Sequence, residues 1–174
     1  LVRLAFFAII TLLLSTLQAA LHQAQELSRT DPVTGALNTR AFTELLQAEI
    51  ERSRRTGRPF TLAYCDVDNF KAVNDRYGHQ AGDEVLKAVV CALQEHSRAN
   101  DIVARLGGDE FAVLLIETEA SAGRAIVERL RQDLLDKLRS GGRPVTVSMG
   151  AVTFEQPPAS ANEAIRRADE LMYE

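Results

Sequence analysis

Two apolar segments, residues 102–106 and 111–116, are separated only by Gly107-Gly108-Asp109-Glu110, and this spacing constrains the fold more than any other feature of the chain. Short runs of branched apolar residues that are joined by a brief connection containing glycine are typical of a β-hairpin. The two strands of a hairpin are antiparallel neighbours in one sheet. We therefore expect a sheet in which at least these two strands run antiparallel.

Helix-type and strand-type patterns alternate through the rest of the chain. Apolar residues at helical spacing predict helices over residues 39–56, 82–96, 120–138 and 162–173, with a short helical turn around residues 69–77. Apolar runs predict strands over residues 60–67 and 145–154. The order helix, strand, helix, hairpin, helix, strand, helix predicts an α/β (α+β) fold. Its central sheet is expected to be mixed, mainly antiparallel and flanked by helices, in a two-layer arrangement of ferredoxin-like type.

Acidic residues gather at two places where a strand is expected to end. Asp66-Val67-Asp68 closes the apolar run over residues 60–67, and Asp109-Glu110 follows the two glycines of the hairpin. Carboxylates that converge repel one another unless a cation lies between them. Oxygen ligands favour Mg²⁺ that is shared with a phosphate. If the two strands are neighbours, the acids indicate metal-dependent phosphoryl chemistry, whereas either segment alone is more typical of a solvated turn.

The charge and the cysteines exclude several classes of protein. The formal net charge is −4, which argues against a general nucleic-acid binder, because such a protein needs a basic surface to match the phosphates. From the charge we expect no nucleic-acid partner. Cys65 and Cys91 fit no metal-ligand spacing and no disulfide framework.

Five blocks within residues 30–174 form recognisable motifs. They are Asp31-Pro32-Val33-Thr34-Gly35-Ala36-Leu37-Asn38, Asp66-Val67-Asp68-Asn69-Phe70-Lys71-Ala72-Val73-Asn74-Asp75, Gly78-His79-Gln80-Ala81-Gly82-Asp83, Arg105-Leu106-Gly107-Gly108-Asp109-Glu110-Phe111 and Ser148-Met149-Gly150. Together these blocks resemble the GGDEF family, the bacterial diguanylate cyclases. Val33 and Ala36 depart mildly from the opening pattern of the family. The resemblance also implies a fold like that of the nucleotidyl cyclases.

The resemblance implies an enzyme that condenses two GTP molecules into cyclic di-GMP and releases two pyrophosphates. It implies two Mg²⁺ or Mn²⁺ ions per active site, held by Asp66, the Val67 carbonyl, Asp109 and Glu110. Asp109 and Glu110 are the implied catalytic residues, and Asp109 is a candidate general base. The implied substrate-binding residues are Phe70, Lys71, Asn74, Asp83, Gly107 and Gly108, with Asn74 and Asp83 on the guanine edge and Lys71 on the phosphates.

The resemblance also implies a homodimer and control by the product. Each subunit would bind one GTP, and the new bonds would form between two GTP molecules held face to face. Arg98-Ala99-Asn100-Asp101 resembles the R-x-x-D inhibitory site of the family, at which cyclic di-GMP binds away from the active site. Arg129 matches a position that can add a further contact to the product.

Residues 4–25 carry no formal charge. As a helix they would span about 33 Å at about 1.5 Å per residue, close to the hydrocarbon thickness of a bilayer of about 30 Å. We favour the end of a transmembrane helix; a signal peptide and a buried or dimer-forming soluble helix are the alternatives. Leu14, Leu17, Leu21, Ala24 and Ser28 form a short heptad-like pattern, which indicates a connector helix.

These observations predict a membrane end and connector over residues 1–29 and a catalytic domain over residues 30–174. We expect the catalytic domain to lie in the cytoplasm at the inner (cytoplasmic) membrane. Members of the family continue beyond the position of Glu174 into a segment with a phosphate-binding lysine and an edge strand, so we expect a truncated C-terminal end. Three other functions stay open: a non-catalytic module that binds GTP or cyclic di-GMP, a cyclase for another nucleotide and a membrane-anchored dimerisation scaffold.

Overall fold

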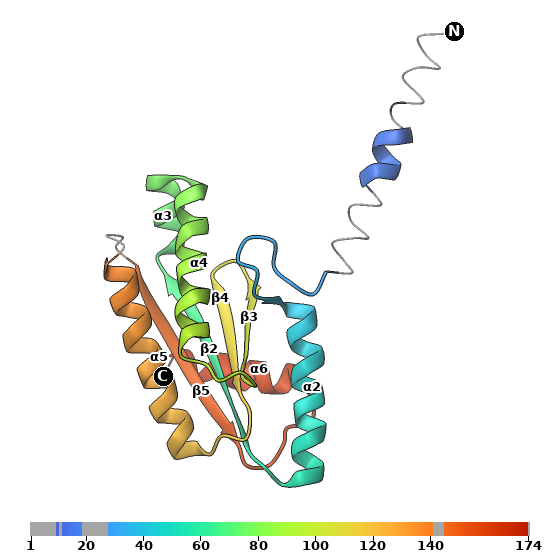
Figure 1. The fold of residues 1–174 in the computed structure, drawn as a ribbon, viewed down its shortest axis with the longest axis vertical. Helices are drawn as coiled ribbons and strands as arrows, with labels where there is room; N and C mark the ends of the chain where they lie inside the picture. Colours follow the sequence, from blue (N-terminus) through green and yellow to red (C-terminus); the bar gives the residue numbers. More distant parts are fainter. Residues whose placement is uncertain (1–9, 11, 19–27, 141–144, 174) are drawn as a thin grey trace.

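A five-stranded sheet forms the centre of the protein in a computed structural model that describes residues 10, 12–18, 28–140 and 145–173 (Figure 1). The strand order is β1-β3-β4-β2-β5. The two-residue strand β1 pairs with β3 in parallel, and all the other pairs are antiparallel. The strands are β1 (Leu37–Asn38), β2 (Phe60–Asp68), β3 (Ile102–Gly107), β4 (Glu110–Leu115) and β5 (Thr146–Phe154).

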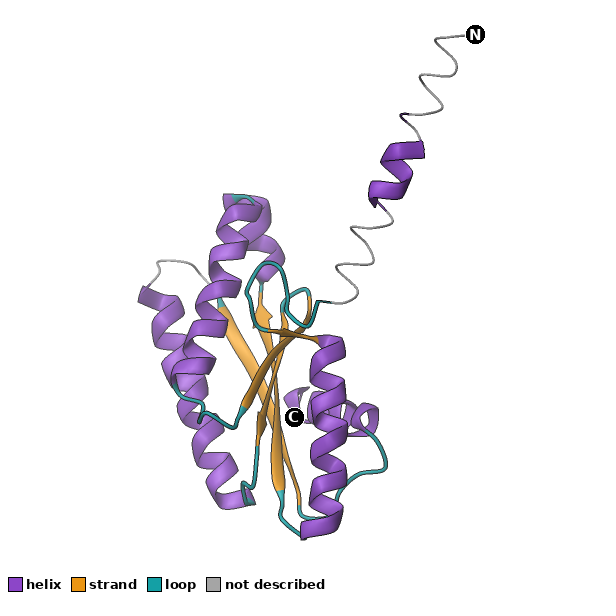
Figure 2. Ribbon diagram, turned by 45° about the vertical axis from the view of Figure 1, so that its right-hand side comes forward, coloured by secondary structure: helices purple, strands orange, loops and turns teal. Residues whose placement is uncertain are grey.

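The helices cover both faces of this sheet. They are α2 (Thr39–Thr56), α3 (Phe70–Tyr77), α4 (His79–Glu95), α5 (Ala120–Ser140) and α6 (Ala161–Glu170), followed by the 3₁₀ turn η1 (Leu171–Tyr173). Buried residues of α3, α4 and α5 share one hydrophobic core with the sheet, and buried residues of α2 and α6 share a second core with its other face. Figure 2 shows the strands between these two groups of helices.

The prediction of two layers is therefore wrong, although the predicted α/β fold with a mainly antiparallel sheet is confirmed. Strands β2 to β5 with α3, α4 and α5 form the expected ferredoxin-like unit. The extra layer arises because α2 and α6 also carry apolar faces, and these faces are buried against the second side of the sheet. The pleat of a strand points successive side chains to opposite faces, so a strand that is apolar throughout can supply two cores.

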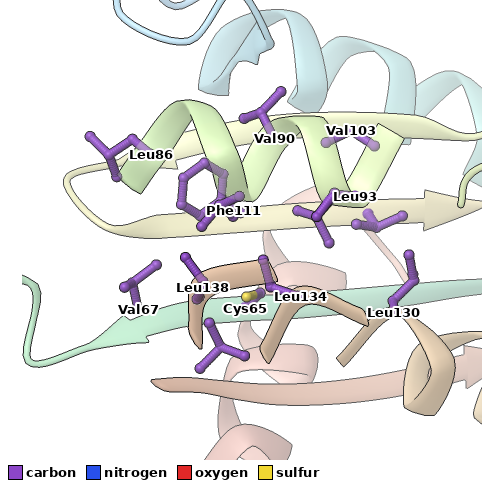
Figure 3. Packing of buried hydrophobic residues seen from close by; sticks show 14 of the residues in the cluster. Cys65, Val67, Leu86, Val90, Leu93, Val103, Phe111, Leu130, Leu134 and Leu138 are labelled. Atoms are coloured by element: carbon purple, nitrogen blue, oxygen red, sulfur yellow. The ribbon is translucent and has the colours of Figure 1, made fainter. Parts of the chain in front are cut away.

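The alternation along β2 shows how one strand serves both cores. Leu62 and Tyr64 belong to the core under α2 and α6, whereas Ala63, Cys65 and Val67 belong to the core under α4 and α5. Figure 3 shows the core under α4 and α5, where side chains of β2, β3, β4, α4 and α5 meet. Burial of each large aliphatic or aromatic side chain stabilises the fold by about 1.5–3 kcal/mol.

The ends of α2 show how local chemistry sets the limits of an element. The side chain of Asn38 accepts a hydrogen bond from the Ala41 N–H at 2.9 Å, and Gly57 ends the helix with a φ of 70°. The predicted bounds of α2 are confirmed. The prediction placed the start of α4 at residue 82, but the helix begins at His79 directly after Gly78. The short strand β1 was not predicted, because two residues carry no periodic signal.

The predicted membrane segment lies mostly outside the described residues. Ile10 and residues 12–18 are helical, and Leu12, Leu13, Leu14 and Leu17 are exposed. Leu21 and Ala24 of the predicted heptad-like pattern are not among the described residues. In the part of the chain that is described, no helix combines the length and the apolar character that a membrane crossing requires.

Candidate active site

Arg105 holds the turn of the β3–β4 hairpin in place. Its Nε and Nη2 donate hydrogen bonds to the carbonyl of Gly108 at 2.9 and 2.7 Å. Its Nη1 donates to both carboxylate oxygens of Asp31, at 2.9 and 3.1 Å. Gly108 has a φ of 48°, in the left-handed region that glycine adopts without strain. The two glycines have no side chains to pack, so the bonds from Arg105 fix the position of the turn.

Asp31 is fixed in its turn by Thr34. The backbone N–H and the hydroxyl of Thr34 donate to Oδ1 of Asp31 at 2.8 and 2.7 Å. Burial alone would raise the pKa of Asp31, but the hydrogen bonds from Thr34 and Arg105 together lower it below its ordinary value. The carboxylate therefore stays ionised at neutral pH and keeps its ion pair with Arg105.

The predicted acids meet at one end of the sheet, next to this turn. The register of β2 against β4 places Asp66 directly opposite Glu110. The N–H of Val67 donates to the carbonyl of Asp109 at 3.2 Å, which joins the end of β2 to the hairpin turn. The condition set by the sequence, that the two acidic strand ends be neighbours, is therefore met.

Asp68 differs from Asp66 in its partners. Its carboxylate accepts hydrogen bonds from the hydroxyls of Thr146 and Ser148 on β5, at 2.6 and 2.8 Å. Ser148 is paired opposite Asp66 in the sheet, yet its hydroxyl bonds to Asp68 instead. The two hydroxyls thus stabilise Asp68, while Asp66 lies among other acids.

The environment of Asp66 raises its pKa to about 6. Burial is the largest cause, and the charges of Asp109, Asp68, Glu110 and Asp169 add to it. A cation bound at this point would reverse the effect, because it favours the charged carboxylate.

The donors at this end of the sheet fit a hard divalent cation in their chemistry. Asp66, Asp109 and Glu110 offer carboxylates, and Val67 offers a carbonyl, which are the oxygen donors that Mg²⁺ and Mn²⁺ take. Among the residues that the structure describes, no group of three or more His, Cys, Asp or Glu side chains is spaced to hold a metal ion as it stands. The side chains would therefore have to move closer together to hold an ion.

The predicted nucleotide-binding residues lie on α3 and α4, which follow β2. Phe70 begins α3, Lys71 is exposed, and Asn74 lies one turn further along. The two helices approach closely at Gly82, where an added Cβ would lie 2.1 Å from Oδ1 of Asn74 and 3.1 Å from Cζ of Phe70. Asp83 follows Gly82 on α4. The structure therefore gathers Phe70, Asn74 and the start of α4 in one place.

A separate cavity of about 410 Å³ is lined by Arg98, Asp101 and Arg52. Both carboxylate oxygens of Asp101 accept backbone N–H groups, from Arg98 at 2.8 Å and from Ile116 at 3.2 Å. Asp101 thereby fixes the loop that carries Arg98. The residues that line the cavity do not include Arg129, which lies on α5 and so on the face of the sheet opposite α2.

A family model described as "Diguanylate cyclase, GGDEF domain" matches residues 28–174. The chain belongs to this GGDEF family. Two curated relatives are the diguanylate cyclase DgcP of Pseudomonas aeruginosa, 41% identical over 157 residues, and the probable diguanylate cyclase DgcT of Escherichia coli, 34% identical over 163 residues. The matches cover 88% and 90% of this chain but only 23% and 35% of the two relatives, so the chain spans about a quarter to a third of their length.

Solved GGDEF structures show the same fold. The diguanylate cyclase SiaD of Pseudomonas aeruginosa, in complex with its activator SiaC, has a TM-score of 0.75 at 35% identity, over 98% of this chain and 67% of SiaD. The GGDEF domain of DgcB from Caulobacter crescentus, in complex with c-di-GMP, has a TM-score of 0.76 at 30% identity, over 84% of this chain and 88% of that domain.

Three residues of this GGDEF site were not predicted from the sequence. Tyr64 is 5% exposed and donates a hydrogen bond to Glu110; burial and this bond raise the pKa of its hydroxyl. Asp169 of α6 adds its charge to the surroundings of Asp66. Arg52 of α2 lines the cavity beside Arg98. Of these three residues, only Tyr64 could have been suspected from the sequence. Its hydroxyl lies within an otherwise apolar strand, where it needs a hydrogen-bond partner.

The raised pKa of Asp66 predicts a pH-dependent effect on stability. The pKa of Asp66 is about 6 in the folded protein and 3.8 as its ordinary value, which we take for the unfolded chain. Well below pH 3.8 the carboxyl is protonated in both states and does not affect the free energy of unfolding. As the pH rises through this window, the carboxyl ionises more readily in the unfolded chain, so the folded state loses stability. In the presence of a chelator, we expect Asp66→Asn to melt at a higher temperature than the wild type at about pH 8 and at the same temperature at about pH 4. Thermal unfolding followed by circular dichroism measures the difference.

Asp136→Asn is the matched control, because Asp136 is largely exposed on α5. We expect this control to melt like the wild type at both pH values. Added Mn²⁺ should raise the melting temperature of the wild type and leave that of Asp66→Asn nearly unchanged. A metal-free Asp66→Asn variant less stable than the wild type at the higher pH would contradict the electrostatic account.

Proposed function

We propose that this chain is the catalytic part of a diguanylate cyclase, which condenses two GTP molecules into cyclic di-GMP with release of two pyrophosphates. The observation that carries the proposal is the position of Asp66 opposite Glu110, beside a glycine turn that Arg105 holds in place. Membership of the GGDEF family and the relatives named diguanylate cyclases support it.

The acids at the end of β2 and at the hairpin are proposed to bind two Mg²⁺ or Mn²⁺ ions. Such ions neutralise a triphosphate and lower the pKa of an attacking hydroxyl, which is worth several kcal/mol of the barrier. Asp66, Asp109, Glu110 and the Val67 carbonyl would hold them. Asp109 would also accept the proton of the 3′-hydroxyl. The support is the oxygen-only donor set and the raised pKa of Asp66.

The remaining residues would bind and orient the nucleotide. Gly107 and Gly108 leave bare backbone at the turn, so a bulky triphosphate can approach. Lys71 is exposed near the start of α3, and its ammonium would bind a phosphate. Asn74 and Asp83 would read the guanine edge, because a carboxylate accepts from the N1–H and amino groups that guanine offers and adenine does not.

The cyclic product has two-fold symmetry, so we propose that two copies of the chain work as a homodimer with one GTP each. We also propose that the catalytic domain lies in the cytoplasm at the inner membrane. The uncharged stretch over residues 4–25 supports this location.

The decisive test is product formation. The wild-type protein, incubated with GTP and Mg²⁺, should form cyclic di-GMP and pyrophosphate, which chromatography separates from GTP. Asp109→Ala should form product at least about 1000-fold more slowly, since loss of a metal ligand removes several kcal/mol and 1.36 kcal/mol is tenfold in rate.

Asp136→Ala, an exposed acid far along α5, is the control and should retain the wild-type rate. Binding of GTP by the wild type without any cyclic product would reject the enzyme in favour of a non-catalytic nucleotide-binding module.

We further propose that the cavity beside Arg98 binds the product and inhibits the enzyme. Its volume of about 410 Å³ lies within the range of small-molecule sites, roughly 300–1,000 Å³. Arg52 and Arg98 line it, and a guanidinium binds phosphate through paired hydrogen bonds. Arg52 forms ion pairs with Glu49 and with Glu117, which also lines the cavity, so a bound phosphate would have to compete with these acids. Arg129 remains a proposed further contact of the family site, which on this chain lies apart from the cavity.

Arg98→Ala should weaken inhibition without slowing the first turnovers. Loss of a charge-assisted hydrogen bond of about 1.5–3 kcal/mol predicts an inhibition constant at least about ten-fold higher. Progress curves with and without added cyclic di-GMP measure it, and Arg139→Ala on α5 is the exposed control. Equal inhibition of Arg98→Ala and the wild type would show that the product does not bind here.

A further inference from the structure

Gly82 is a buried glycine inside a helix, which calls for a physical reason. It lies in the first turns of α4, where its N–H bonds to the carbonyl of Gly78 at 3.3 Å. Glycine is the least favourable residue apart from proline in a helix, and alanine is the most favourable. The backbone of Gly82 is not among those with a positive φ, so no special conformation explains the residue.

The space beside Gly82 is filled by Asn74 of α3. A Cβ added at residue 82 would lie 2.1 Å from Oδ1 and 3.0 Å from Cγ of Asn74, and 3.1 Å from Cζ of Phe70. The first distance is far shorter than any real contact, so the Asn74 amide would have to move. Helices α3 and α4 lie side by side here (Figure 1), and the bare backbone of α4 is the surface on which the amide rests.

We propose that Gly82 is a specificity-determining residue, because its missing side chain leaves the space in which the Asn74 amide takes the orientation that recognises guanine. This inference rests on the proposed function, which assigns the guanine edge to Asn74 and Asp83. An amide offers one acceptor and two donors in a fixed geometry. When such a group is turned away from its partner, the base loses a hydrogen bond and a buried polar group is left unpaired.

A purely structural role for Gly82 predicts a different pattern. If the glycine only allowed α3 and α4 to pack closely, alanine would lower stability whatever residue stood at position 74, and the choice of base would not change. If Gly82 acts through Asn74, removal of the Asn74 side chain abolishes the effect of the substitution. A double-mutant cycle between the two positions separates these cases.

The experiment compares wild type, Gly82→Ala, Asn74→Ala and Asn74→Ala/Gly82→Ala. Isothermal titration calorimetry measures the dissociation constants of GTP and ATP analogues in which a methylene group bridges the α- and β-phosphates. We expect Gly82→Ala to weaken binding of the GTP analogue about ten-fold, the effect of one lost hydrogen bond, and to leave the ATP analogue unchanged. In the Asn74→Ala background, Gly82→Ala should change neither constant.

Melting temperatures give a second measurement that does not depend on nucleotide. Gly82→Ala should melt below the wild type, whereas Asn74→Ala/Gly82→Ala should melt no lower than Asn74→Ala. If Gly82→Ala does not fold but the double variant does, the conflict with Asn74 is supported directly. If neither folds, the inference is wrong.

Gly123→Ala is the matched control. Gly123 is also a glycine within a helix, since it lies on α5, whereas Asn74 and Asp83 lie on α3 and α4. A Cβ added at Gly123 would lie 2.5 Å from Oγ1 of Thr61 on β2. This variant should lose stability and keep the wild-type preference for the guanine analogue.

Two results would separate this inference from the proposed function. A wild type without preference for the guanine analogue overturns the proposed substrate. A wild type that prefers it, together with a Gly82→Ala variant that keeps the full preference, overturns only the role of Gly82.

Discussion

The ion pair between Arg105 and Asp31 is the interaction on which the rest of the site depends. Both side chains are largely buried, at 12% and 16% exposed, and the guanidinium also donates two hydrogen bonds to the carbonyl of Gly108. A single side chain thus joins the turn after residue 30 to the turn that carries Asp109 and Glu110. Because glycines supply no packing of their own, the position of these acids relative to Asp66 is set by this contact and by the register of β2 against β4.

Several acidic side chains lie close together beside this turn. Two hydroxyls from β5 stabilise Asp68, Tyr64 donates to Glu110, and Asp66 is left with a pKa raised to about 6. Perturbed pKa values of this kind cluster at functional sites. A cation bound here would favour the charged form of Asp66, so the proposed affinity for a divalent ion would rest on the same electrostatics that raise this pKa. The residues proposed to recognise the nucleotide lie elsewhere, where α3 and α4 approach at Gly82.

The local elements could be predicted from the sequence, but several contacts over long distances along the chain could not. Helical spacing and the Asn38 cap predict α2, and the glycine connection predicts the β3–β4 hairpin, because both signals are local. The layer of α2 and α6 was missed, since an apolar helix face does not say which side of a sheet it covers. Asp31 and Arg105 are 74 residues apart, and nothing in either segment indicates that they pair. Arg52 carries no motif, so its place beside Arg98 comes from the fold alone.

The most direct test of this account is the rate of cyclic di-GMP formation by Asp31→Asn. Asparagine keeps the size of the side chain and can still accept a hydrogen bond from Thr34, but it removes the charge that holds Arg105. A misplacement of the turn by about 1 Å can cost about 100-fold in rate. We therefore expect a protein that is folded by circular dichroism and at least about ten-fold slower than the wild type. An Asp31→Asn variant that forms product as fast as the wild type would contradict the claim that this ion pair positions the site.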